Sequence, residues 1–427
     1  MQLESKIKKL NYYLEHQPLT NITNLRRHRP DYMLVILTSL LLVVGLVIIY
    51  AISPGLAASN GVSQSYYVLR QLMAIGIGVI GFITVAFLPI NFWIKHLKIL
   101  VIISAIAALA VEVLGQKVNG AVRWIQVGGI SFQAVELIKF TLMIWLACFL
   151  AQKIREGNIS VFKYTLKPLL VVLLILGIVV AGLESDLGSY VVLVIISICM
   201  AFVAGLPFRR IALIGGIITI GVVLAISSSG YRRARLLTFL HPTQNCQSSA
   251  TGYQECQAII AVGSGGIIGK GLGKGVQDFG YLPETNNDSI FAVYAEQFGF
   301  VGVSALIILF LAFFKRFINI IEKAPDNFSR LFVAGVLAWV GSQTLINIGA
   351  MTGLLPLKGI TLPLISYGGT SIVFLMVSIG LVFNISHYTV GRSSESAGKE
   401  NIRGLNENNT LRGRNRRPYY ANSSRSE

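Results

Sequence analysis

The chain has 427 residues, of which 54% are hydrophobic and only 13% are charged, and its mean hydropathy is +0.67. This balance is far from that of a soluble globular protein, so it excludes a water-soluble fold and requires lipid around most of the chain. The net charge of +17 does not indicate a nucleic-acid partner, because most of the excess lies in the two tails and in short loops. Membrane topology and anionic lipids account for charge in those places.

Ten apolar segments have about the length that crosses a bilayer, and each should be a helix because backbone polar groups find no water there. They lie at approximately 33–53, 68–88, 97–115, 133–152, 167–183, 187–206, 211–229, 289–314, 331–353 and 363–388. The fifth and sixth segments are the hardest to separate, because only Glu184, Ser185 and Asp186 stand between them. The sequence therefore predicts an all-α polytopic membrane protein of about ten transmembrane helices, with a long extracytoplasmic loop between helices 7 and 8.

Charge counting orients these helices. Residues 1–30 are polar and basic and lack the features of a cleaved secretory signal, so the first helix is expected to be an uncleaved anchor. The side of the membrane that holds the N-terminal tail carries 26 Lys and Arg residues, against 9 on the other side. The positive-inside rule then predicts that both termini are cytoplasmic. The body of the protein is assigned to 31–390, and 391–427 is expected to be a disordered basic tail.

Two outward segments differ from simple connections. Residues 119–133 alternate apolar and polar residues and contain glycines, which predicts a small structured or re-entrant element at the membrane surface. The loop at about 231–288 is far longer than usual, and loops of this length tend to be functional or disordered. It contains Cys246 and Cys256, which could form a disulfide outside the cytoplasm or remain two free thiols.

The long loop ends in a run rich in glycine and lysine, GSGGIIGKGLGKG. This run does not match a nucleotide-binding P-loop, because Ser264 and Ile268 stand where the first glycine of the motif should be. It is either a flexible loop or a site where backbone amides, Lys270 and Lys274 attract an anion. Asp288 follows at the start of the next apolar segment. It could cap a helix, or it could present a carboxylate to a substrate at the outer membrane surface.

Ionisable residues within the apolar segments are costly and therefore suggest function. Glu136 and Lys139 are three residues apart, so they share one helix face and could form a structural pair or line a polar cavity. The other ionisable residues that could face such a cavity or its outer end are Arg70, Glu112, Glu184, Asp186 and Glu296. For Arg70, a side chain that reaches to the membrane surface is an equally simple explanation.

Four collinear motifs resemble signatures of the SEDS family, the FtsW/RodA peptidoglycan glycosyltransferases. They read NGAVRWIQVGGISFQAVELIK, ESDLGS, GSGGIIGKGLGKGVQ with NNDSIFAVYAEQFGFVG, and NIGAMTGLLPLKGITLPLISYGGTS. The resemblance extends from about Arg29 to His387, and Leu357–Ser371 is more similar to division members than to elongation members. Asn286–Asn287 replaces the usual His-Thr, and Glu184–Ser185 replaces the usual Gln-Pro, which puts local loop geometry in question.

The resemblance implies an enzyme of the bacterial inner membrane that polymerises lipid II into glycan strands on the outer face during cell division. A class B penicillin-binding transpeptidase and other division proteins are the implied partners, and the septum is the implied location. The essential aspartate of the family falls on Asp288, which would be the general base of an inverting transfer. The residues expected to bind substrate are Arg70, Arg123, Glu136, Lys139, Asp186, Lys270, Lys274 and Glu296.

No organic cofactor is expected, although a weakly held Mg²⁺ or Mn²⁺ could bind between Asp288 and the substrate diphosphate. Two alternatives from other functional classes stay open. A lipid II flippase would use Glu136, Lys139 and Glu296 as a pathway through the membrane and would treat Asp288 as a helix cap. A division scaffold would use its tails to recruit partners.

Overall fold

The computed structural model describes residues 29–389, except 119–120, 128–129, 228–229, 231–232, 234–238, 240–249, 278 and 357–358. The described residues up to Tyr388 belong to one compact unit. Residues 1–28 of the tail predicted at 1–30 lie outside the described residues, and so do the tail predicted at 391–427 and Cys246.

Every predicted apolar segment overlaps a helix of the described chain, although residues 363–368 of the last segment precede its helix and are not helical. These helices are α2 (Tyr32–Asn60), α3 (Tyr66–Phe87), α5 (Leu97–Leu114), α6 (Ala134–Arg155), the consecutive η2 (Phe162–Leu166), α7 (Lys167–Leu176) and η3 (Gly177–Leu183), α8 (Leu187–Val203), α9 (Phe208–Ser227), α13 (Ile290–Glu322), α14 (Asn327–Met351) and α15 (Gly369–Ser386). Eight helices in the described part are long and apolar enough to cross a membrane. Two helices are not among those eight: α8, which has 17 residues, and α9, which has 20.

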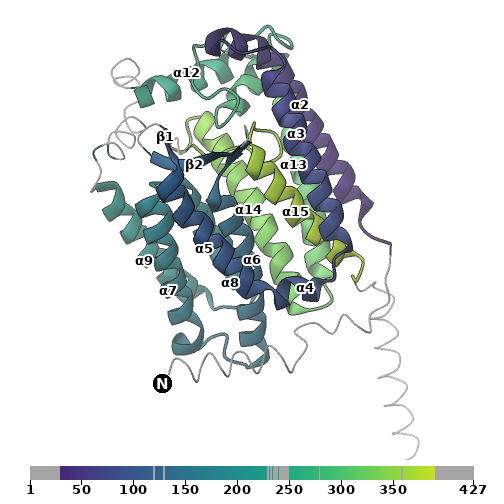
Figure 1. Cartoon of the computed structure of the whole chain (residues 1–427), viewed down its shortest axis with the longest axis vertical. Helices are drawn as coiled ribbons and strands as arrows, with labels where there is room; N and C mark the ends of the chain where they lie inside the picture. The colour runs from purple at the N-terminus through teal and green to yellow at the C-terminus, as the bar shows by residue number, and fades with distance from the viewer. Residues whose placement is uncertain are drawn as a thin grey trace, which may run out of the picture. The chain divides into compact units, whose positions relative to one another are not determined.

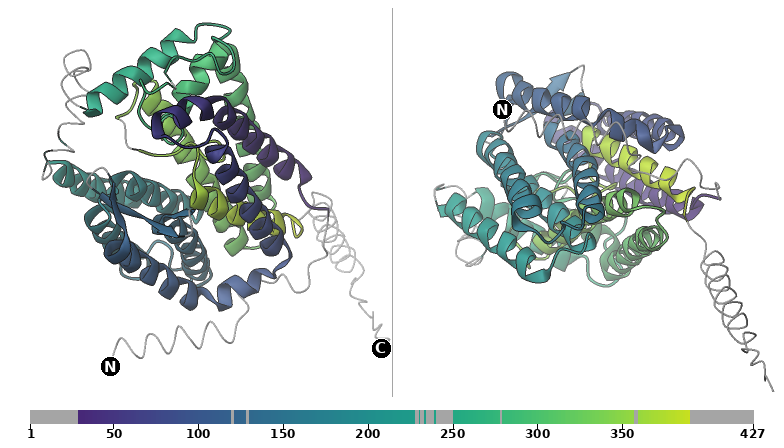
Figure 2. Two further views of the ribbon diagram at one scale, coloured as in Figure 1. Left: turned by 45° about the horizontal axis from the view of Figure 1, so that its top comes forward. Right: turned by 90° about the horizontal axis from the view of Figure 1, so that it is seen from below.

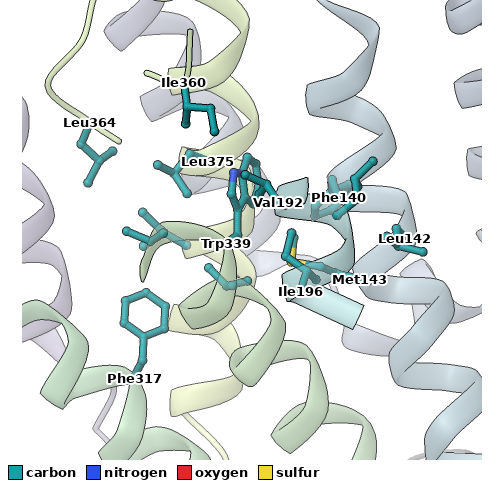
Figure 3. Close-up of a cluster of buried hydrophobic side chains, with 14 of the residues drawn as sticks. Phe140, Leu142, Met143, Val192, Ile196, Phe317, Trp339, Ile360, Leu364 and Leu375 are labelled. Atoms are coloured by element: carbon teal, nitrogen blue, oxygen red, sulfur yellow. The ribbon is translucent and has the colours of Figure 1, made fainter. Parts of the chain in front are cut away.

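The centre of the unit is formed by α6 and α14, which pack on each other and on α8. In α6, 89% of an apolar stretch of 18 residues is buried, whereas in the peripheral α5 the buried share is 17%. A helix that is apolar on all sides and enclosed by other helices is expected at such a position. Figure 3 shows the fully buried Trp339 of α14 among Val192, Met143 and Leu375.

Small residues bring α3 and α15 together, and both views in Figure 2 show α15 beside the α2–α3 pair. A Cβ on Gly380 would lie 2.7 Å from the carbonyl oxygen of Phe82, and one on Gly81 would lie 2.8 Å from Val377. Close backbone approach through glycine is a common way for helices to associate in lipid, where no hydrophobic effect drives them together.

The segments that connect α5 to α6 and α9 to α13 contain structure of their own. Strands β1 (Gln116–Val118), β2 (Ala121–Val127) and β3 (Ile130–Phe132) form an antiparallel sheet, with Trp124 opposite Gln116 and Ile125 opposite Phe132. The element predicted at 119–133 as structured or re-entrant therefore contains strands in its described part. The long loop contains α12 (Ala250–Ser264), a helix that we did not predict and that packs on α13 and α14 (Figure 1).

Candidate active site

Asp288 lies just before the N-terminal end of α13, and its exposed fraction is 7%. The N-cap residue of α13 is Ser289, so Asp288 precedes the cap, one residue from the position predicted by the capping hypothesis. The amide Nε2 of Gln254 on α12 lies 3.5 Å from Asp288 Oδ1 and donates to Ser289 Oγ at 3.1 Å. Gly359 faces the other oxygen, since a Cβ placed there would be 3.7 Å from Asp288 Oδ2. The carboxylate is thus positioned by segments distant in the sequence.

Three successive carbonyl groups around Asp288 are each held by a hydrogen-bond donor. The amide of Tyr367 donates to Asn286 O at 2.8 Å, and Ser366 Oγ donates to Asn287 O at 2.6 Å. Asn347 Nδ2 donates both to Asp288 O and to Ile360 O, each at 2.7 Å. These bonds fix the backbone that carries the carboxylate, and such support is what a preorganised catalytic group requires.

Backbone strain occurs close to these contacts. Among the described residues, the non-glycine residues with positive φ are Ser185, Glu284 and Leu364. The carbonyl of Glu284 accepts from the amides of Asn287 and Ser289 at 3.0 and 3.1 Å, and Leu364 lies within the segment that holds the Asp288 backbone. Strained residues of this kind persist only where surrounding contacts enforce them, and they are concentrated at functional sites.

The glycine-rich run packs against a break in α13. Gly299 has φ 62 and ψ −164, so the helix is interrupted there and some of its carbonyl groups lose their helical partners. The amides of Lys270 and Gly271 donate to the carbonyls of Glu296 and Gln297, each at 3.0 Å. A Cβ on Gly269 would overlap the Gln297 carbonyl. The glycines therefore permit close approach between two backbones, which composition alone did not reveal.

The glycine-rich loop surrounds the carboxylate of Glu296 on α13. Its Oε1 accepts from Lys270 Nζ at 2.7 Å and from the Val276 amide at 3.0 Å, while Oε2 accepts from the Gln277 amide at 3.2 Å. The loop therefore holds a carboxylate of the same chain, and the binding of a substrate anion stays a prediction. Lys274 is exposed in the same loop.

Arg123 on β2 binds the connection between η3 and α8. Its Nη2 donates to Ser185 O at 2.7 Å and its Nε to Glu184 O at 3.4 Å. Asp186 is the N-cap of α8, where it accepts from the Ser189 amide at 3.0 Å and from Gln133 Nε2 at 3.4 Å. Both predicted substrate residues, Arg123 and Asp186, therefore also have structural contacts.

Glu136 and Lys139 form the predicted pair, with Oε1 and Nζ 2.7 Å apart and Lys139 fully buried. Lys139 Nζ also lies 4.9 Å from the centroid of the Trp339 ring, a favourable cation–π geometry. Glu136 Oε2 is buried and has no hydrogen-bond partner among the described residues. This oxygen of Glu136 can therefore accept a hydrogen bond from another group.

Arg70 lies near the N-terminal end of α3, with its guanidinium 4.2 Å from the Tyr66 ring centroid. It lines a pocket of about 280 Å³ together with Tyr367 and Thr370. Apolar residues of α3 and α15 such as Met73 and Phe374 form the rest of its wall. The pocket therefore combines a cation with an apolar furrow between two helices.

Cys256 is disulfide-bonded, while Cys148 and Cys199 are free. Because Cys246 lies outside the described residues, its pairing with Cys256 stays a prediction. No group of three or more His, Cys, Asp and Glu side chains within the described chain could hold a metal ion.

Sequence reasoning missed Gln254, Asn347 and Ser366, which are buried around Asp288. They carry no charge, so a search for ionisable residues in apolar segments passed over them. For Asn347 a signal was present, because an amide side chain within an apolar helix needs partners. Gln254 gave no such signal, because the helix around it was not predicted.

The fold and the site together define a multi-pass helical membrane protein with a buried, rigidly held carboxylate between its spanning helices and a glycine-rich loop. Residues 31–391 match the family model described as cell cycle protein, FtsW/RodA/SpoVE. The chain belongs to this family.

Curated relatives and solved structures agree with this assignment. Stage V sporulation protein E of Bacillus subtilis is 35% identical over 366 residues, covering 85% of this chain and 99% of the relative. A probable peptidoglycan glycosyltransferase FtsW of Saccharophagus degradans is 36% identical, covering 84% of this chain and 92% of the relative. A chain from a peptidoglycan synthase complex that coordinates polymerization and crosslinking superposes with a TM-score of 0.68 at 27% identity, covering 84% and 97%. Thermus thermophilus RodA superposes with a TM-score of 0.59 at 26% identity, covering 84% of this chain and 98% of RodA.

Proposed function

We propose that this protein is a peptidoglycan glycosyltransferase that polymerises lipid II on the outer face of the bacterial cytoplasmic membrane during cell division. The observation that carries the proposal is the fixed carboxylate of Asp288, whose flanking carbonyls are held by Tyr367, Ser366 and Asn347. Family membership and relatives named as peptidoglycan glycosyltransferases support the class of reaction.

Asp288 acts as the general base in this proposal. It takes the proton from the 4-hydroxyl of the acceptor sugar as that oxygen forms a bond to the anomeric carbon of the growing chain. The bond between this carbon and the diphosphate oxygen breaks, so the configuration inverts and undecaprenyl diphosphate leaves. A well-placed base contributes about 10²–10⁴-fold to such a step. Gln254, 3.5 Å from Oδ1, helps to orient the carboxylate.

The leaving diphosphate needs preorganised positive charge. Arg70 is suited to this role, because the furrow beside it offers a path for a polyprenyl chain whose diphosphate lies at the membrane surface. Lys274 is the exposed cation of the glycine-rich loop, and Lys270 acts mainly by tying that loop to Glu296. Arg123 adds a positive field while holding the connection at Ser185.

Glu136, Lys139 and Asp186 line the polar region that holds the headgroup in this proposal. The unpartnered Oε2 of Glu136 can accept a hydrogen bond from a sugar hydroxyl or an amide. The predicted Mg²⁺ or Mn²⁺ stays a prediction. The described residues form no metal site, and no step of the proposed reaction depends on a metal.

The proposed partner is a class B penicillin-binding transpeptidase, together with other division proteins at the septum. A solved relative that belongs to a complex for polymerization and crosslinking supports such a partner. The excess of Lys and Arg on the side of the termini supports cytoplasmic tails.

One reconstitution tests the base assignment and also addresses the flippase alternative. The full-length chain is placed in vesicles with its transpeptidase partner and with lipid II accessible on the outer leaflet. We expect Asp288→Asn to reduce glycan strand synthesis by at least about 10²-fold. Glu322→Gln, an exposed acid at the other end of α13, is the control and should polymerise at the wild-type rate.

Wild-type activity in the Asp288→Asn variant would show that Asp288 is not the base. Labelled lipid II that crosses the bilayer without any strand synthesis, in wild type and variant alike, would favour the flippase.

A further inference from the structure

A second cavity, separate from the residues around Asp288, lies between α5, α6 and the η2–α7–η3 helix. Its volume is about 430 Å³, which is within the range of sites that hold small ligands. The wall is almost entirely apolar and includes Ala105, Ile138 and Val179. Its polar members are Ser104 and Thr141, whose hydroxyl groups bond each other at 2.7 Å, and Glu184.

This cavity opens toward lipid. Val101 and Leu109 of α5 and Ile175 of α7 line it, yet they are also among the exposed large apolar side chains of the unit. Val101 and Leu109 are about 12 Å apart along the helix axis at a rise of about 1.5 Å per residue. That length is close to half of a hydrocarbon core of about 30 Å, so the cavity matches a lipid chain from one leaflet.

Glu184 is located at one end of this cavity, directly after η3. Its side chain is almost completely buried, at 1% exposure, and neither carboxylate oxygen has a hydrogen-bond partner among the described residues. The guanidinium of Arg123 does not fill this role, since it donates its hydrogen bonds to the backbone carbonyls of Glu184 and Ser185. A buried carboxyl group without partners is costly, so its retention here indicates a ligand with a complementary group.

We propose that this cavity binds an outer-leaflet phospholipid whose acyl chain fills the apolar wall and whose primary ammonium headgroup pairs with the Glu184 carboxylate. The headgroup end is on the outward side of the predicted topology, where η3 ends and the β1–β2–β3 sheet begins. A chain that extends from there toward the membrane centre follows α5 from Leu109 to Val101.

The surrounding charges favour an ammonium group over an anionic headgroup. Glu184 is near Asp186 at the start of α8 and Glu112 at the end of α5, and Arg123 on β2 is the nearby cation. On α6, the Glu136–Lys139 pair is neutralised within itself. Three carboxyl groups against one guanidinium repel a phosphatidylglycerol headgroup and attract a cation.

Proton binding provides a test that does not depend on any variant. Burial, and next the charge of Asp186, raise the pKa of Glu184 to about 8. Only the ionised carboxylate pairs with an ammonium group, so affinity should rise with pH up to about pH 8 and then level off. Between pH 6.5 and 8.5 the ionised fraction of a group with this pKa increases by about 25-fold, and the Kd should fall by a similar factor.

The experiment is native mass spectrometry of the full-length chain, purified in detergent, delipidated and titrated with phosphatidylethanolamine or phosphatidylglycerol of identical acyl chains. Wild type should prefer phosphatidylethanolamine by about tenfold at pH 8.5, and Glu184→Gln should lose both the preference and the pH dependence. Ala108→Phe, which fills the cavity, should lose binding of both lipids. Ile106→Phe, on the lipid-exposed side of α5, is its matched control.

Equal binding of the two lipids by wild type, or a preference that survives in Glu184→Gln, would overturn the proposal. Unchanged binding in Ala108→Phe would place the lipid elsewhere and overturn it as well. If Ala108→Phe does not fold, as judged by its melting temperature and gel filtration, the pH dependence of wild type still decides the question. A Kd that does not change between pH 6.5 and 8.5 contradicts pairing with Glu184.

Discussion

Asn347 joins the carbonyl of Asp288 to the segment before α15. Its Nδ2 donates to the carbonyls of Asp288 and Ile360, and in Asn347→Ala both buried carbonyls lose this donor. Each unsatisfied group costs about 1–3 kcal/mol, and a small displacement of a catalytic group can lower turnover by about 10²-fold. We expect a lower melting temperature and a fall mainly in kcat of strand synthesis.

Thr344→Val is the matched control for this prediction. Thr344 is buried on the same helix, but its hydroxyl donates to Val340 O within α14, so its loss should leave strand synthesis near the wild-type rate. Equal kcat for Asn347→Ala and wild type would mean that Asn347 does not position Asp288.

Glu184 also predicts how stability depends on pH. Its folded-state pKa of about 8 is above the usual value of about 4.3 for the unfolded chain, so the folded state binds more protons between these values. The free energy of unfolding should therefore decrease as pH rises from about 4.5 to 8, by up to a few kcal/mol. In delipidated protein, Glu184→Gln should remove this component, which melting curves from pH 5 to 9 would measure. If the stability of Glu184→Gln changes with pH as steeply as that of wild type, the pH dependence belongs to other groups.

At the scale of elements, the docking of the glycine-rich loop on the broken α13 depends on Gly269. This residue has φ +87, and a Cβ there would overlap the backbone of Gln297 and Phe298. Gly269→Ala should destabilise the loop by on the order of 3 kcal/mol and make residues 265–289 sensitive to limited proteolysis. Gly266→Ala is the control, because Gly266 has φ +56 but open space around its Cβ position. It should cost only about 1–2 kcal/mol. Equal protease resistance in the two variants would argue against close packing as the reason for Gly269.

The elements differ in how far the sequence revealed them. The approximate positions of the apolar helices were predictable, because hydropathy and length are properties of each segment alone. The pair Glu136–Lys139 was predictable for the same reason, since both residues lie on one helix face. The partner of Lys270 was not, because Glu296 is 26 residues away and reaches the loop only where Gly299 interrupts α13. Contacts of this kind depend on tertiary packing.

For the molecule as a whole, the direction in which the site faces rests on charge distribution. If the positive-inside rule holds, the loops between α5 and α6 and between α9 and α13 are outside, and the connection between α13 and α14 is inside. A diphosphate-linked sugar on the outer leaflet could then reach Asp288 without crossing the membrane. Lipid II polymerisation outside the cell requires this orientation.

Cysteine labelling in intact cells tests this orientation. Lys274→Cys, exposed in the glycine-rich loop, should react with a membrane-impermeant maleimide, whereas Lys323→Cys, exposed after α13, should react only after the membrane is permeabilised. Wild type gives the background from the native cysteines, of which Cys148 is buried and Cys256 is bonded. The opposite pattern would place Asp288 on the cytoplasmic side, where it could not act on lipid II of the outer leaflet, and it would invert the headgroup end of the proposed phospholipid site. One measurement therefore constrains both proposals, although each retains its own test in Asp288→Asn and Glu184→Gln.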